Sequence, residues 1–156
     1  MHRLTEELVG LGHHVTAITM KLCESIPKHS YPVEIIDLGG YSLMKALRFS
    51  HSAAKRVRNL NPDIVIVNSY WSELSPYFIS DIPTILVIHD IGFLKGTKTR
   101  LRTVKKHILS LTANYSNAIV VPTKVVKEDL IAYLNLDPTK IYVIGFEGVD
   151  GPFRWE

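Results

Sequence analysis

His89 and Asp90 are the adjacent pair with the clearest capacity for chemistry in this sequence of 156 residues. A histidine exchanges its proton near neutral pH, and a neighbouring carboxylate accepts hydrogen bonds or supplies charge. The pair stands at the end of an apolar run at 85–89, and Gly92 follows two residues later. An imidazole in this place can donate to a ligand hydroxyl or phosphate. We therefore predict His89 and Asp90 as catalytic residues and Gly92 as a ligand contact.

Polar and aromatic residues also end two other apolar runs. Parallel strands end at the same edge of a sheet, and ligands bind outside that edge. Hydroxyl, amide and basic groups gathered there suit a polyhydroxylated or phosphorylated ligand. The alternative is that these residues only end the strands, because turns favour polar residues. The candidate binding residues are Asn68, Ser69, Tyr70, Trp71, Thr123 and Lys124.

Basic residues dominate the segment between Asp90 and Glu128, which contains no acidic residue. The commonest explanation of such a run is a solvated helix face. The alternative is a face that attracts anionic lipid headgroups, to which each cation contributes about 1 kcal/mol near the surface. The cations of this candidate membrane or anion face are Lys95, Lys98, Arg100, Arg102, Lys105 and Lys106.

Six short runs of Val, Ile and Leu must position these side chains. None alternates cleanly with polar residues, which is typical of strands covered on both faces by helices. The segments between most runs have the length and periodicity of crossover helices. The sequence therefore predicts an α/β fold with a Rossmann-like, doubly wound parallel sheet of about six strands. The runs lie at 15–19, 33–37, 64–68, 85–89, 118–122 and 141–145.

The first predicted helix, at 2–11, has no strand before it. In a doubly wound sheet the first strand usually lies in the middle. The strands at 15–19 and 64–68 should therefore either pair directly or keep open edges that favour homo-oligomers. A later helix, at 99–112, is expected to bury the stripe formed by Leu101, Val104, Ile108 and Leu111.

Composition excludes several classes of protein. With 46% hydrophobic residues, 21% charged residues and a net charge of +3, the chain is an ordinary globular domain and not a nucleic-acid-coating protein. The single cysteine, Cys23, makes no intramolecular disulfide and has no metal-ligand cluster around it, so no metal is expected. Neither a Gly-x-Gly-x-x-Gly motif, a P-loop nor a Gly-x-Ser-x-Gly elbow is present. An acidic amino terminus and the lack of a long apolar run predict a cytoplasmic location.

Five segments together resemble the amino-terminal domain of the family 4 (group 1) glycosyltransferases, enzymes of the two-domain GT-B fold. Each motif is weak alone, but their order and spacing are specific, and they cover nearly the whole chain. The segments are LVGLGHHVTAIT at 8–19, NPDIVIVN at 61–68, IPTILVIHD at 82–90, NAIVVPTK at 117–124 and KIYVI to GVD at 140–150.

The resemblance implies a retaining transfer of a sugar from a nucleotide-sugar donor, which is a substrate and not a cofactor. Residues 1–147 would form the acceptor-binding domain without its first strand, and residues 148–156 would begin the linker to a donor domain. His89 matches the family's histidine that contacts the donor sugar. The residues at 68–71 fall on the acceptor side, and Thr123 and Lys124 face the cleft. Because no donor domain with its acidic motif is present, we expect no transfer by this chain alone.

The partners implied by this interpretation are a sugar or lipid-linked acceptor and a chain that supplies the donor domain. The basic face adds a peripheral contact with the anionic inner face of the membrane, and no nucleic acid is expected. An alternative from another class remains: a non-catalytic Rossmann-like module or remnant that binds a partner or an anionic surface through the segment at 95–127.

Overall fold

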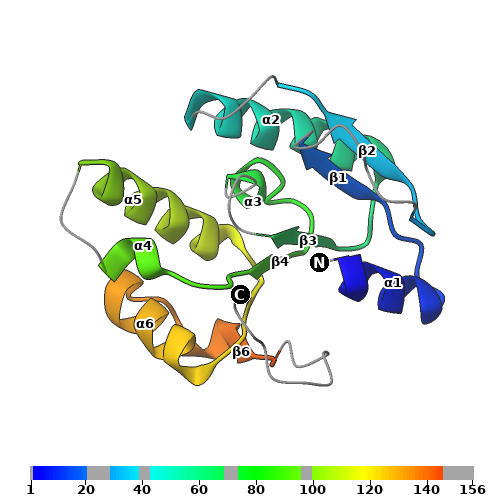
Figure 1. Ribbon diagram of the computed structural model, residues 1–156. Helices are drawn as coiled ribbons and strands as arrows, with labels where there is room; N and C mark the ends of the chain where they lie inside the picture. The colour runs from blue at the N-terminus through cyan, green and yellow to red at the C-terminus, as the bar shows by residue number, and fades with distance from the viewer. Residues whose placement is uncertain (1, 21–28, 39–42, 69–73, 96–99, 146–156) are drawn as a thin grey trace, which may run out of the picture.

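The computed structural model describes residues 2–20, 29–38, 43–68, 74–95 and 100–145. Within these residues, strands and helices alternate along the chain, which confirms the α/β fold (Figure 1). The strands are β1 (Ala17–Met20), β2 (Val33–Ile36), β3 (Val65–Asn68), β4 (Thr84–Val87), β5 (Ala118–Val121) and β6 (Ile141–Val143). The helices are α1 (His2–Gly10), α2 (Leu43–Leu60), α3 (Ser75–Phe78), α4 (Gly92–Lys95), α5 (Arg100–Tyr115) and α6 (Lys124–Leu134), with the 3₁₀ turn η1 (Pro138–Lys140).

The strands are all parallel and are divided between two sheets. One sheet contains β1 and β2, and the other contains β3, β4, β5 and β6 in that order. Figure 1 shows the β1–β2 pair standing apart from β3 and β4, and no ladder joins the two sheets in the described part of the chain. The strands predicted from the apolar runs are therefore present, but the one sheet expected from them is split between β1 and β3.

The backbone hydrogen bonds of β1 and β3 show which side of each strand is paired with a neighbouring strand. The amide of Ala17 donates to the carbonyl of Pro32 at 2.9 Å, and the amide of Val65 donates to the carbonyl of Pro83 at 2.8 Å. Backbone groups point to alternate sides along a strand, so those of Ile18 and Ile66 point away from β2 and β4. Of the two outcomes expected for these strands, direct pairing or open edges, the described residues show the open edges.

Each sheet has its own apolar core. The larger cluster lies between the four-stranded sheet and its helices, and the smaller one lies between the β1–β2 pair and α2. The larger cluster includes the central strands of the sheet, where Leu86, Ile119 and Val121 are each no more than 1% exposed. Phe49 of α2, at 5% exposure, covers the smaller cluster. The larger core therefore fixes β3, β4 and β5, whose carboxyl ends carry the candidate site.

The buried face of α5 differs from the predicted one. Val104 and Leu111 are 43% and 40% exposed, whereas Leu109, Thr112 and Ser116 are at most 1% exposed. The two polar residues are tolerated there because each hydroxyl donates to a carbonyl one turn earlier in the helix, at 2.8 Å and 2.9 Å. The predicted stripe is therefore wrong at Val104 and Leu111, whereas Ile108 is half-buried and the side chain of Leu101 lies outside the described residues.

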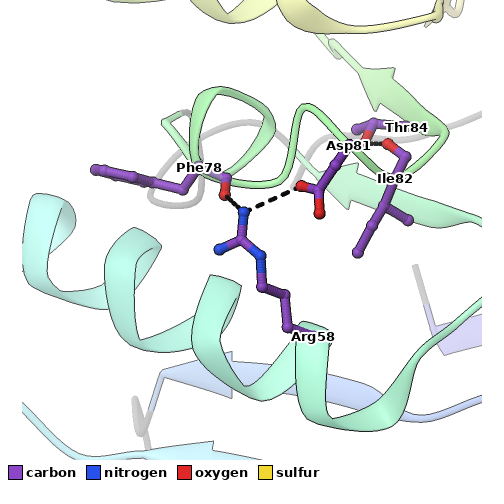
Figure 2. Close-up of polar contacts among 5 residues, drawn as sticks. All are labelled: Arg58, Phe78, Asp81, Ile82 and Thr84. Atoms are coloured by element: carbon purple, nitrogen blue, oxygen red, sulfur yellow. Dashed lines mark hydrogen bonds and ion pairs between the residues drawn. The ribbon is translucent and has the colours of Figure 1, made fainter.

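Arg58 joins α2 to the segment between α3 and β4 (Figure 2). Its guanidinium donates to the carbonyl of Phe78 and lies 3.0 Å from Asp81 Oδ1. A backbone hydrogen bond and then the guanidinium lower the pKa of Asp81. In the same segment Thr84 Oγ1 donates to the carbonyl of Ile82 at 3.0 Å. These bonds fix the chain where it enters β4.

Candidate functional site

His89 and Asn68 meet at the carboxyl ends of β3 and β4. The register of the two strands places Asn68 opposite Val87, and His89 follows two residues after Val87. His89 Nε2 lies 2.8 Å from Asn68 Oδ1, a hydrogen bond between residues 21 positions apart in the sequence. The sheet therefore brings together two of the residues that the sequence analysis placed at a common edge.

This hydrogen bond sets the chemistry of the imidazole. Because Asn68 Oδ1 is an acceptor only, His89 Nε2 must donate and carry the hydrogen. The neutral ring then keeps Nδ1 as an acceptor. Partial burial lowers the pKa of His89, although the nearby carboxylate of Asp90 opposes this shift. At neutral pH, His89 is therefore an uncharged ring whose acceptor atom is Nδ1.

Asp90 serves the turn that follows β4. Its Oδ1 accepts a hydrogen bond at 3.0 Å from the amide of Gly92, the first residue of α4. A Cβ atom added to Gly92 would lie 3.5 Å from the same oxygen, which is ordinary van der Waals contact. The structure thus gives Asp90 a local role in directing the chain away from His89, and it gives no steric requirement for glycine at 92.

Thr123 and Lys124 lie where β5 gives way to α6. Thr123 is the N-cap of α6, and its hydroxyl accepts a hydrogen bond from the amide of Val126 at 3.2 Å. Lys124 is the first residue of the helix and is exposed. Capping of this kind stabilises the helix start, which accounts for the threonine without a ligand. Lys124 is placed at the same sheet edge as His89.

The remaining predicted residues are only partly described. Ser69, Tyr70, Trp71 and Lys98 lie outside the described residues, and for Lys95 and Arg100 only the helical backbone is described. In α5, Arg102 is half-buried, while Lys105 and Lys106 are exposed. The candidate basic face is therefore represented by three side chains of the first two turns of α5.

Two adjoining hollows along α2 were not predicted. The first, of about 410 Å³, and the second, of about 270 Å³, share His51 and Phe78. The ring centroids of these two residues are 5.5 Å apart at an interplanar angle of 80°. Helical spacing could have revealed this face, because Arg48, His51, Ser52 and Lys55 recur every three or four residues. The other lining residues are Leu38, Leu47, Arg58 and Asn59.

Neither a metal site nor a membrane span is found in the described ranges. No group of three or more His, Cys, Asp or Glu side chains is arranged there to hold a metal ion. Helices among these residues also lack the length and apolar character needed to cross a bilayer.

Comparison with known proteins gives a family and a fold. The sequence model of Glycosyltransferase Family 4 matches residues 1–146. Among 11 matching chains of solved structure is one titled putative UDP-N-acetylglucosamine 2-epimerase, from Listeria monocytogenes. The TM-score is 0.52 at 24% identity, and the match covers 72% of this chain but 30% of the Listeria chain. That likeness supports the Rossmann-like fold alone. No curated protein sequence matches.

Proposed function

The chain belongs to glycosyltransferase family 4, and on that premise we propose that it is the acceptor-binding half of a retaining glycosyltransferase. The donor would be a nucleotide sugar, and the acceptor a sugar or a lipid-linked sugar. The observation that supports this most directly is the hydrogen bond between His89 and Asn68 at the edge where parallel strands receive ligands. Transfer requires a donor-binding domain, so we propose that these 156 residues are inactive alone.

His89 suits the recognition of a hydroxylated ligand. Its Nε2 is engaged by Asn68, Nδ1 is the acceptor atom of the neutral ring, and His89 has a further interaction within the fold. A ligand hydroxyl that donates to Nδ1 would be oriented and made more nucleophilic by the same contact. Because burial lowers the pKa of the ring, the neutral form that this contact needs predominates at neutral pH. Asn68 acts as a positioning residue in this scheme because it fixes the tautomer.

Ligand binding to the full chain tests this proposal by NMR of the histidine ring signals. The probes are methyl glucoside, mannose and N-acetylglucosamine, each titrated into the protein at pH 7.5. We expect at least one to shift the His89 signals, and we expect His89→Ala to abolish its binding. The matched control is His14→Ala, because His14 is exposed. Failure of all three sugars to move the His89 signals would contradict the proposal.

A separate assay tests whether the chain is inactive alone. Purified protein is incubated with UDP-glucose, UDP-N-acetylglucosamine or GDP-mannose and each sugar acceptor, and release of the nucleoside diphosphate is followed. We expect none above the level of the His89→Ala variant. Turnover by the wild-type chain that this variant lacks would show that no second domain is needed.

The second candidate is a non-catalytic module that docks on an anionic membrane surface through α5. The exposed side chains of Val104 and Leu111 favour it, because they lie on the helix that also carries Lys105 and Lys106. Basic helices with exposed apolar residues bind at membrane interfaces. Under this interpretation the protein co-sediments with phosphatidylglycerol vesicles and not with phosphatidylcholine vesicles, and Leu111→Ser weakens that binding. Equal behaviour with both vesicles would exclude it.

A further inference from the structure

The two hollows beside α2 adjoin, because His51 and Phe78 line both of them. We name them together the α2 groove, with Leu47 in the first hollow and Asn59 in the second. Arg58 holds the carbonyl of Phe78, and Figure 2 shows the Phe78 side chain extending from there over the preceding turns of α2. Its ring meets the ring of His51 edge to face, with 5.5 Å between the centroids. One wall of the groove is therefore fixed by contacts between α2 and α3.

Aromatic contacts support this wall from behind. The ring of Phe78 also meets that of Tyr77, at 5.4 Å between the centroids. Tyr77 in turn packs edge to face on Tyr115 of α5, at 5.1 Å. Side chains of α2, α3 and α5 thus form one continuous set of rings. Such edge-to-face pairs add to the stability gained from burial, so the hollows belong to a packed part of the fold.

The charge of the α2 groove is positive. Five basic residues and no acidic residue occur in α2. Two of these cations pair with carboxylates of other segments, and a third has another interaction within the fold. The remaining two, Arg48 and Lys55, are exposed and line the groove. Within the described ranges, neither of their side chains has a hydrogen bond or an ion pair, and no residue that lines the groove is acidic.

The spacing of Arg48, His51 and Lys55 places them on one face of α2, because residues three and four apart are neighbours on a helix. Arg48 and Lys55 are seven residues apart, or about 10 Å along the helix axis. Each lies about one turn from His51, so both long side chains can reach an anion placed over that residue. Guanidinium and ammonium groups donate charge-assisted hydrogen bonds to carboxylate, sulfonate or phosphate oxygens.

Apolar side chains line the first hollow beside these cations. Leu38 packs against the smaller core, Leu47 is 37% exposed, and Phe78 is half-buried. The volume of this hollow, about 410 Å³, falls within the range of small-molecule sites, about 300–1,000 Å³. A bilayer contacts side chains that project from a surface, whereas these apolar groups line a hollow. Their arrangement therefore favours a small molecule with an apolar body and an anionic end.

We propose that the α2 groove binds a small amphiphilic anion. Its aromatic ring or short alkyl chain packs on Leu47 and Phe78, and its carboxylate, sulfonate or phosphate group lies between Arg48 and Lys55. This site is separate from the one at His89, because the two share no residue. The proposal therefore goes beyond the acceptor-binding function and does not depend on it.

The probe is 8-anilinonaphthalene-1-sulfonate, an aromatic sulfonate whose fluorescence rises in apolar surroundings. It is titrated into the full chain at pH 7.5 and low ionic strength. The test variant carries Arg48→Gln and Lys55→Gln, and the control carries Lys106→Gln and Lys140→Gln, which remove the same charge from α5 and η1. The test variant should raise the dissociation constant about tenfold or more, and the control should change it less than about threefold. Equal effects of the two variants would overturn the proposal.

A second pair of variants tests the apolar part of the site. Leu47→Ser should weaken dye binding about fivefold, because less apolar surface is buried against the ring. Its matched control is Leu111→Ser, since Leu111 is similarly exposed, at 40%, on α5; this variant should leave the binding unchanged. Both positions are partly exposed, so both variants should fold, as circular dichroism would show. A dye that depends on Leu111 and not on Leu47 binds elsewhere, and that result would also overturn the proposal.

Competition experiments separate this ligand class from other occupants. Octanoate should displace the dye, and a hexaglutamate peptide should not; the reverse would assign the groove to an acidic peptide and overturn the proposal. Co-sedimentation with phosphatidylglycerol vesicles that needs Arg48 and Lys55, with dye binding that does not, would assign the cations to a bilayer with the same consequence. His89→Ala should leave dye binding unchanged, so failure of the acceptor function and failure of this proposal give different results.

Discussion

Replacing Asn117 with alanine should destabilise the start of β4. Asn117 Oδ1 accepts a hydrogen bond from the amide of Thr84 at 2.9 Å, and Thr84 is 1% exposed. In Asn117→Ala the buried amide loses its acceptor, and water cannot readily replace it. An unsatisfied buried donor costs about 1–3 kcal/mol. For a domain of this size each kcal/mol corresponds to about 2–4 °C in melting temperature.

The assay is urea unfolding at pH 7.5, followed by circular dichroism. Asn117→Asp is the matched control, because its carboxylate keeps an acceptor at the position of Oδ1. We expect the alanine variant to lose about 1–3 kcal/mol in the free energy of unfolding and the aspartate variant to stay within about 0.5 kcal/mol of the wild type. The reasoning is refuted if both variants lose the same stability, because the acceptor oxygen would then not matter.

Three further predictions concern α5, the histidine and the sheet edges. Leu109→Ala should lower the free energy of unfolding by about 2–5 kcal/mol, and Leu111→Ala should lower it by less than about 1 kcal/mol. Urea unfolding of both variants measures these losses. A larger loss in Leu111→Ala than in Leu109→Ala would contradict the observed burial. Because the folded-state pKa of His89 lies below its ordinary value of 6.5, the unfolded state binds more protons, and stability should fall as the pH drops through 6.5. His89→Gln should weaken that dependence between pH 8 and pH 5, and an unchanged slope would show that other groups cause it. The open edges at Ile18 and Ile66 should produce concentration-dependent self-association in sedimentation, which Ile66→Lys should reduce; a monomer at every concentration would count against this.

The local elements of the fold could be predicted because their signals are local. Short runs of β-branched residues predicted each strand, since such residues favour extended chain and the runs are too short for helices. Thr123 was predicted as a ligand contact, and the structure shows that its hydroxyl caps α6. Parallel topology predicts that strand ends gather at one edge, and the structure brings Asn68 and His89 together there.

The buried side of α5 could not be predicted in the same way. Val104 and Leu111 have the spacing of a buried stripe, yet Thr112 and Ser116 occupy that position in the fold. Their hydroxyls are satisfied by carbonyls of the same helix, so burying them carries little penalty. A hydrophobicity pattern cannot register this compensation, because it depends on the geometry of the helix and on which neighbour is packed against it.

The sequence by itself determined the fold class, the order of strands and helices, and the residue types that stand at the ends of the strands. These follow from properties of neighbouring residues. Tertiary structure alone decided that the β1–β2 pair stands apart from β3–β6 and that Asn68 fixes the tautomer of His89. Each of these depends on contacts between residues far apart in the chain, whose partners are chosen by packing and backbone hydrogen bonding and not by local pattern.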